Sequence, residues 1–182
     1  VGSRLAIGEN SIAGGTNSTA LGSSSDARGD YSIALGYNSE ASHDYSMALG
    51  ISSTSQADST LTIGYSSSAS GESSIAIGFG SITYSAATKS VALGNNSSAS
   101  RNSSTAIGYN SSATANNSTA QGVSSSASGT SSTAIGYKSS ATGGDATALG
   151  SDSNASSFSV AIGSDSKASG NSSIAIGSFS FA

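Results

Sequence analysis

The side chains that most often carry out catalysis are sparse in this chain of 182 residues. There is one histidine, His43, no cysteine, and a set of acids scattered along the sequence. Serines are abundant, but none sits in a nucleophile elbow beside a base, so neither a catalytic triad nor a metal cluster is expected. Gly143-Gly144-Asp145 is faintly similar to a calcium β-roll, yet the nonapeptide period of such rolls is missing. We therefore expect a protein that is not an enzyme and needs no metal and no cofactor.

The residues best suited to contact a partner are aromatic, and each follows a recurrent glycine. They are Tyr37, Tyr65, Phe79, Tyr109 and Tyr137. Tyrosine joins an apolar ring to a polar tip and is a frequent contact residue in interfaces. Because a glycine of this kind is typical of a tight turn, the rings are expected to project from an edge of the fold. The alternative is that they pack on neighbouring repeats or on an adjacent chain.

A second candidate contact region is a repeat unit that is two residues longer than most others. It runs from Phe79 to Gly94, and the extra residues are expected around Gly80–Ser85. Insertions in solenoids form loops on one face, which is often the binding face. The hypothesis is that Tyr84 and Lys89 help to form a partner contact there.

A repeat that covers the whole chain must position these candidates. Thirteen glycines, each preceded by a mostly apolar triplet, recur every 14 residues, apart from one spacing of 16 and one of 13. They are Gly8, Gly22, Gly36, Gly50, Gly64, Gly78, Gly94, Gly108, Gly122, Gly136, Gly150, Gly163 and Gly177. The residue before the glycine is Ile or Leu except at Gln121, and the one before that is Ala except at Thr62. Ser stands three residues after every glycine, and Ala five residues after it except at Ser55 and Thr83.

This period predicts an all-β fold. Fourteen residues are too few for a pair of helices, but they suit two strands of about five residues and two tight turns. Stacked at about 4.8 Å, thirteen such coils would form a parallel β-solenoid roughly 60 Å long. The glycine is expected to need a positive φ or to lack room for a Cβ, and the serine after it to bond a backbone group of the turn. Both are thus expected to be structural.

Composition excludes several classes of partner. The net charge is −4 and neither half of the chain carries a basic patch that could neutralise phosphates, so no nucleic-acid partner is expected. No stretch approaches the roughly 18 apolar residues of a membrane helix, and the N-terminus lacks a signal-peptide pattern. If the protein is secreted, we expect this chain to be an excised piece of it.

The apolar triplets predict an obligate oligomer. In Ser32-Ile33-Ala34-Leu35-Gly36 both faces of the strand are apolar, whereas a strand with one face in water should alternate. One face can point into the coil, and the other would form an apolar stripe of the kind that marks an interface. Gln121 interrupts this pattern. Near a symmetry axis its copies could bond one another or hold water or an ion; alternatively it is tolerated at a local wet position.

The motif resembles the YadA-like head of the trimeric autotransporter adhesins. Strings that carry the resemblance are Ser90-Val91-Ala92-Leu93-Gly94 and Ser159-Val160-Ala161-Ile162-Gly163, each with a following Ser and Ala. It covers nearly all of residues 3–182 and implies a left-handed parallel β-roll that assembles as a homotrimer. Residues 1–182 would then be a single head segment, with the stalk and the membrane anchor outside the chain.

The resemblance also implies a place and a role. It implies an exposed passenger region at the outer membrane of a Gram-negative bacterium, where it contributes to virulence by attachment to the host. The partners it implies are matrix proteins of the collagen, fibronectin or laminin type, or host cell receptors, with membrane contact only through the absent anchor. Affinity would come from many weak sites along the rod.

Two other functions remain open. One is a passive structural spacer that projects another binding domain. The other is an ice-binding solenoid, which the aligned Thr105, Thr119, Thr133 and Thr147 suggest. It is disfavoured because that ladder lies within the apolar strands and lacks outward Thr-x-Thr pairs.

Overall fold

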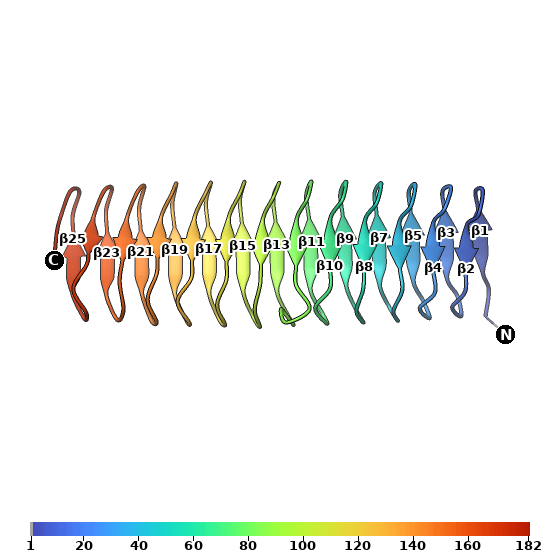
Figure 1. Ribbon diagram of the computed structural model, residues 1–182, viewed down its shortest axis with the longest axis horizontal. Helices are drawn as coiled ribbons and strands as arrows, with labels where there is room; N and C mark the ends of the chain where they lie inside the picture. The colour runs from blue at the N-terminus through green and yellow to red at the C-terminus, as the bar shows by residue number, and fades with distance from the viewer. Residues whose placement is uncertain (1) are drawn as a thin grey trace.

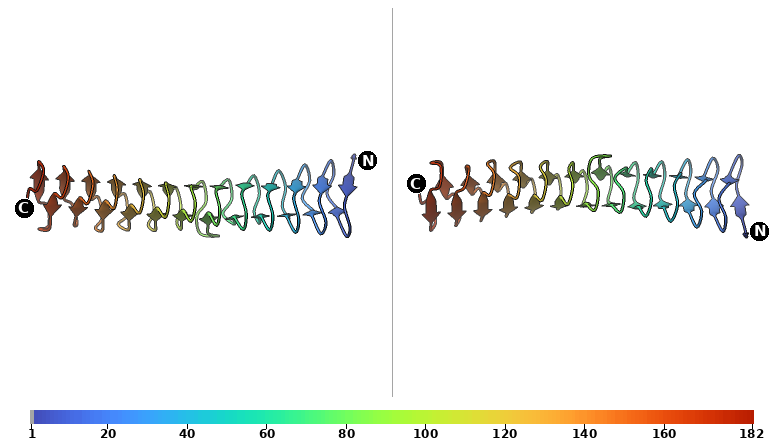
Figure 2. Two further views of the ribbon diagram at one scale, coloured as in Figure 1. Left: turned by 90° about the horizontal axis from the view of Figure 1, so that it is seen from above. Right: turned by 90° about the horizontal axis from the view of Figure 1, so that it is seen from below.

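The computed structural model describes residues 2–182, and within them it contains two parallel β-sheets and no helix. Odd-numbered strands pair only with odd-numbered strands and form a sheet of 13, while even-numbered strands form a sheet of 12. The chain passes from one sheet to the other and back once per coil, so the coils stack into a straight rod (Figure 1) with two layers (Figure 2). The predicted parallel β-solenoid with a 14-residue coil is confirmed.

The strands of the 13-stranded sheet are three residues long. They are β1 Leu5–Ile7, β3 Thr19–Leu21, β5 Ile33–Leu35, β7 Met47–Leu49, β9 Leu61–Ile63, β11 Ile75–Ile77, β13 Val91–Leu93, β15 Thr105–Ile107, β17 Thr119–Gln121, β19 Thr133–Ile135, β21 Thr147–Leu149, β23 Val160–Ile162 and β25 Ile174–Ile176.

The strands of the 12-stranded sheet are two residues long. They are β2 Ile12–Ala13, β4 Asp26–Ala27, β6 Glu40–Ala41, β8 Thr54–Ser55, β10 Ser68–Ala69, β12 Ile82–Thr83, β14 Ser98–Ala99, β16 Ser112–Ala113, β18 Ser126–Ala127, β20 Ser140–Ala141, β22 Asn154–Ala155 and β24 Lys167–Ala168.

These strands are shorter than the five residues expected, because each turn contains a residue in the left-handed region. Asn38 has φ 53° in the turn after the glycine, and Tyr45 has φ 57° in the turn after the two-residue strand. Such a residue cannot continue a strand, since a strand needs extended backbone. Backbone hydrogen bonds nevertheless run from coil to coil through the turns, as from Ser52 N–H to the carbonyl of Tyr37 at 2.9 Å. The whole coil therefore stacks, and not the strands alone.

Each coil consists of two similar halves, which the sequence analysis did not anticipate. Ser18 and Ser25 lie in successive halves, and each hydroxyl donates to the backbone carbonyl three residues earlier at 2.8 Å. Each of these serines is followed two residues later by a buried alanine, Ala20 and Ala27. The predicted role of the serine after the glycine is thereby confirmed, and in several coils the serine of the other half has the same role, as at Ser104 and Ser118.

The recurrent glycine distinguishes the two halves. Gly50 has φ +134°, a conformation that L side chains rarely adopt, and a Cβ there would lie 2.3 Å from the carbonyl oxygen of Gly64 in the next coil. Both reasons expected for the glycine, positive φ and lack of space, are confirmed.

The interior between the two sheets is filled by alanine and hydroxyl side chains. Ala34 and Ala41 are completely buried, and every buried hydrophobic residue among residues 2–182 is an alanine. The middle residue of each triplet therefore points inward and its two neighbours point outward. Side chains larger than threonine are absent from the fully buried set of this region, so the coil is too narrow to enclose an aliphatic core.

The inward alanines form one column along each sheet, and two residues that replace them compensate one another. Ser55 and Thr62 replace inward alanines of the same coil, and their hydroxyl oxygens lie 2.7 Å apart in the interior. Ser55 also lies 2.7 Å from the carbonyl of Met47, and Thr62 lies 3.1 Å from that of Thr54. The buried hydroxyls of Ser55 and Thr62 thus both have hydrogen-bond partners, as buried polar groups usually do.

The two coils of unusual length differ from the others in the same turn. Ile82 and Thr83 keep their regular pairing with Ser98 and Ala99, so the two extra residues of the long coil lie in the turn after them, between Tyr84 and Ala87. This is slightly later than the Gly80–Ser85 expected. The coil that ends at Gly163 lacks one residue in the corresponding turn, between Ala155 and Phe158. The turn at the recurrent glycine keeps its length throughout.

Candidate functional site

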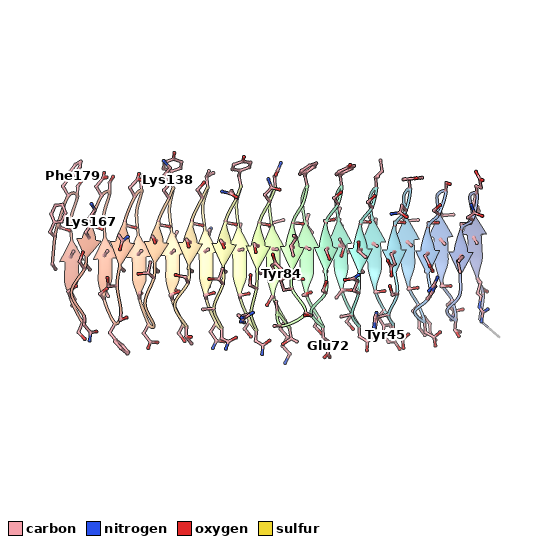
Figure 3. All side chains as sticks on the ribbon, viewed as in Figure 1. Tyr45, Glu72, Tyr84, Lys138, Lys167 and Phe179 are labelled. Carbon is pink, nitrogen blue, oxygen red and sulfur yellow. The ribbon has the colours of Figure 1, made fainter. Side chains whose placement is uncertain are left out.

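The rod presents two sheet faces and two edges. The edge formed by the turns after the recurrent glycines is called the glycine edge, and the edge formed by the turns after the two-residue strands is called the second edge. In Figure 3 the glycine edge is at the top, with Lys138 and Phe179, and the second edge is at the bottom, with Tyr45 and Glu72.

The glycine edge carries a ridge of exposed apolar side chains. Four consecutive coils contribute Tyr37, Ile51, Tyr65 and Phe79, of which 59%, 49%, 52% and 52% is exposed. After Asn95, three further coils contribute Tyr109, Val123 and Tyr137, which are also exposed. We call these seven residues the glycine-edge ridge. The expectation that the aromatic residues project from an edge is met, and the column also holds Ile51 and Val123, which were not proposed.

Side chains of the ridge also contact one another. The rings of Tyr65 and Phe79 are stacked with centroids 5.3 Å apart and an angle of 7° between their planes. The Nζ of Lys138 lies 5.1 Å from the centroid of the Tyr137 ring, within the range of a cation–π contact. Packing on a neighbouring coil and exposure to solvent therefore occur together at Tyr65 and Phe79, whereas Lys138 belongs to the same turn as Tyr137.

The second edge carries a stacked aromatic pair that was not predicted. Tyr31 and Tyr45 are exposed, and their rings are stacked with centroids 5.4 Å apart and an interplanar angle of 1°. Both stand five residues before a recurrent glycine. This shared position in the repeat was the signal that could have identified them.

Tyr84 and Lys89 lie on the second edge, at the long coil. Tyr84 is exposed in the turn where the extra residues lie, and the Lys89 side chain is exposed at the end of the same turn. The seven predicted contact residues are therefore not brought together. Five lie on the glycine edge, and Tyr84 and Lys89 lie on the opposite one.

Acids of the N-terminal half also form a column on the second edge. The Asp44 carboxylate accepts the backbone N–H of Asp30 at 2.8 Å, and the Asp58 carboxylate accepts that of Asp44 at 3.2 Å. Asp30 accepts the N–H of Thr16 in the same way at 2.6 Å. These carboxylates join successive turns, so their alignment has a structural explanation.

The two sheet faces differ sharply in polarity. The outward positions of the 13-stranded sheet hold Ile, Leu, Val or Met, apart from Gln121 and a set of threonines, and none of these strands contains a charged residue. We call this surface the aliphatic face. Ile63, Leu93 and Ile135 are each more than a third exposed on it. Apart from Ile12 and Ile82, the outward residues of the 12-stranded sheet are polar, and Asp26 in β4 forms an ion pair with Arg28 at 2.7 Å.

Residues 2–182 contain no detected pocket and no group of three or more His, Asp or Glu side chains that could hold a metal ion. No helix capable of crossing a bilayer occurs in this part of the chain. The surfaces that remain for function are the glycine-edge ridge, the second edge and the aliphatic face.

The fold and these surfaces define a repetitive β-solenoid with extended exposed faces. The sequence matches the YadA head domain repeat at residues 5–25, 27–53, 62–81, 86–111, 113–139, 141–157 and 158–180. The chain therefore belongs to the YadA head family, and this supports an adhesin-type role at the bacterial surface.

A solved structure similar to this chain is the collagen-binding domain of the Yersinia adhesin YadA, with 23% sequence identity and a TM-score of 0.40. The alignment covers 95% of this chain and 79% of that one. No curated protein matches the sequence significantly.

Proposed function

We propose that the chain is the exposed head of a surface adhesin of a Gram-negative bacterium, and that it works as a homotrimer. It attaches to host matrix proteins of the collagen, fibronectin or laminin type, or to host receptors, by many weak contacts and without catalysis. Membership of the YadA head family supports the adhesin class. The observation that carries the self-association is that every large aliphatic side chain of residues 2–182 lies outside the coil.

A single coil gains little from the hydrophobic effect, because its interior is made of alanine and hydroxyl groups. Burying one large aliphatic side chain contributes about 1.5–3 kcal/mol, and each coil places up to two of them on the aliphatic face. An uncharged face of this length, roughly 60 Å, exceeds what soluble monomers usually expose.

A second copy of the chain is the occupant that fits this face best. The outward side chains recur once per coil, at the strand spacing of about 4.8 Å, over the whole rod. A partner that covers all of them must present side chains at the same spacing. Another copy does so without further assumption, and closed rotational symmetry gives each copy the same contacts.

Light scattering tests the self-association. The wild-type chain is expected to have a mass of three times 17.4 kDa. Ile77→Asp places a charge on the aliphatic face and is expected to shift the mass toward that of one chain, because a charge buried without a partner is costly. Ser98→Asp, on the polar sheet, is the matched control and should stay assembled. A stable monomer of the wild-type chain would contradict the proposal.

For attachment, we propose the glycine-edge ridge as the main contact surface. It is the longest run of exposed aromatic and aliphatic side chains on either edge, and exposed tyrosines are effective contact residues. Repetition along the rod and over three chains would multiply a weak contact.

Binding to immobilised collagen, fibronectin, laminin and epithelial cells tests this surface. The double variant Tyr65→Ser/Phe79→Ser removes the stacked pair of the ridge, and serine occurs at this position in other coils. Apparent affinity is expected to fall about tenfold or more. The matched control is Tyr31→Ser/Tyr45→Ser, which removes the stacked pair of the second edge. If the wild-type chain bound none of these surfaces, the passive spacer would be the better function.

A further inference from the structure

The regular repeat of the aliphatic face leaves the axial alignment of two associated copies poorly determined. Its outward side chains repeat once per coil, so two copies shifted by one coil along the rod bury nearly the same side chains as two copies in alignment. Only one coil of thirteen loses its partner. Apolar burial has no direction and barely distinguishes the two arrangements. An aligned assembly therefore needs side chains that break the repeat.

Gln121 is the strongest such break. It is the outward residue at the end of β17, and in the sheet it lies between Ile107 of β15 and Ile135 of β19. Its side chain is exposed on the single chain. Every other coil places Ile or Leu at this position.

Four threonines lie beside Gln121 in the other outward column. Thr105, Thr119, Thr133 and Thr147 occupy consecutive coils and pair with one another in β15, β17, β19 and β21. Coils on either side have valine in this column, at Val91 and Val160. Apart from the isolated Thr19 in β3, the polar residues of the aliphatic face thus form one segment, centred near Gln121 and flanked by apolar coils.

We infer that Gln121, supported by this block of threonines, fixes the axial alignment between copies of the chain. The inference rests on the proposed self-association through the aliphatic face. In a rotationally symmetric assembly identical residues lie at the same height, so the Gln121 amides meet and each can donate to and accept from another. After a shift of one coil each amide faces Ile107 or Ile135 instead. A buried amide without a partner is unfavourable, and single polar residues in apolar interfaces are known to fix alignment in this way.

Disulfide formation between copies measures the alignment, because the chain has no cysteine of its own. Leu149→Cys and Ile162→Cys place reporters at paired positions of neighbouring coils, at the ends of β21 and β23. Equal amounts of the two chains, one carrying a size tag, are mixed, assembled and oxidised. Disulfides join Cα atoms about 4.4–6.8 Å apart, so they distinguish aligned copies from copies shifted by about 4.8 Å. Thr147→Cys and Val160→Cys repeat the measurement in the other outward column.

With Gln121 present, same-residue disulfides should dominate in at least one column. With Gln121→Ile, the share of Leu149→Cys to Ile162→Cys disulfides should rise about tenfold, and the assembly should melt at a higher temperature, since an amide is replaced by an aliphatic group. Ile107→Leu, which leaves Gln121 in place, is the control and should change neither result.

Two results would overturn the inference while leaving self-association intact. One is a share of shifted disulfides that Gln121→Ile does not change, and the other is an assembled chain without same-residue disulfides in either column. A chain that has the mass of a monomer by light scattering and forms no disulfide would instead refute the proposed self-association itself.

Discussion

The paired hydroxyls of Ser55 and Thr62 allow a sharp test of how the interior is built. Apart from the coil that contains Thr83, every other coil has alanine at both of these inward positions, as at Ala69 and Ala76. The perturbation is to restore alanine singly and together, in Ser55→Ala, Thr62→Ala and the double variant. The double variant recreates the interior of the neighbouring coil.

The magnitude follows from the contacts that each change removes. Thr62→Ala deletes the 2.7 Å contact to Ser55 and the 3.1 Å bond to the Thr54 carbonyl and removes a methyl group, at a cost of about 1–3 kcal/mol. Ser55→Ala removes the same shared contact and the bond to Met47, at a cost of about 1 kcal/mol. Because the contact between the hydroxyls is lost only once, the double variant should be more stable than the sum of the single effects by about 1 kcal/mol.

Urea unfolding followed by circular dichroism measures these free energies. All variants must be compared at one protein concentration, because assembly contributes to apparent stability. Ser25→Ala combined with Thr62→Ala is the control for additivity, since the Ser25 hydroxyl bonds the Gly22 carbonyl in a distant coil. Additivity of Ser55→Ala and Thr62→Ala to within about 0.3 kcal/mol would refute the reasoning that the two hydroxyls compensate one another.

Two further predictions concern the turns. Gly122→Ala should destabilise the protein by about 3 kcal/mol or more in thermal unfolding, because φ is +138° and a Cβ would lie 2.3 Å from the Gly136 oxygen; Gly144→Ala, where the nearest atom is 3.9 Å away, should change it by less than about 0.5 kcal/mol. Equal effects of the two would contradict this account of the glycine. Deletion of Ser85 and Ala86 should leave the melting temperature nearly unchanged and weaken adhesion to matrix proteins, if Tyr84 takes part in the contact. Unchanged adhesion would remove the long coil from the contact surface.

Much of the fold could be predicted because nearly every coil has the same residue types at the same positions. The glycine, the serine after it and the two alanine columns each have a structural role, and that role is visible because it recurs in nearly every coil. Strand length was overestimated because the left-handed residues that end the strands have no unique sequence signature. These positions hold Asn, Ser, Asp, Tyr, Lys or Phe, as at Asn38, Tyr45 and Lys89.

The arrangement of the candidate site was harder to predict from the sequence. Tyr37 and Tyr84 both follow a strand, but they lie on opposite edges, and this depends on where the coil turns back. The pairing of Ser55 with Thr62 was equally hidden, since the two departures appeared unrelated until the interior columns were known to face each other. Tyr31 and Tyr45 were not predicted, because neither of them directly follows a recurrent glycine.

The constant length of the turns at the glycine edge has a consequence for how such rods diversify. Among residues 2–182, extra or missing residues occur only on the second edge, where the coil that ends at Gly94 gains two and the coil that ends at Gly163 loses one. Gene duplication of one whole unit would extend the rod by about 4.8 Å and leave the interior of every other coil unchanged. The length of the rod and the shape of the second edge can therefore evolve independently, while the side chains of the glycine edge keep a fixed spacing from coil to coil.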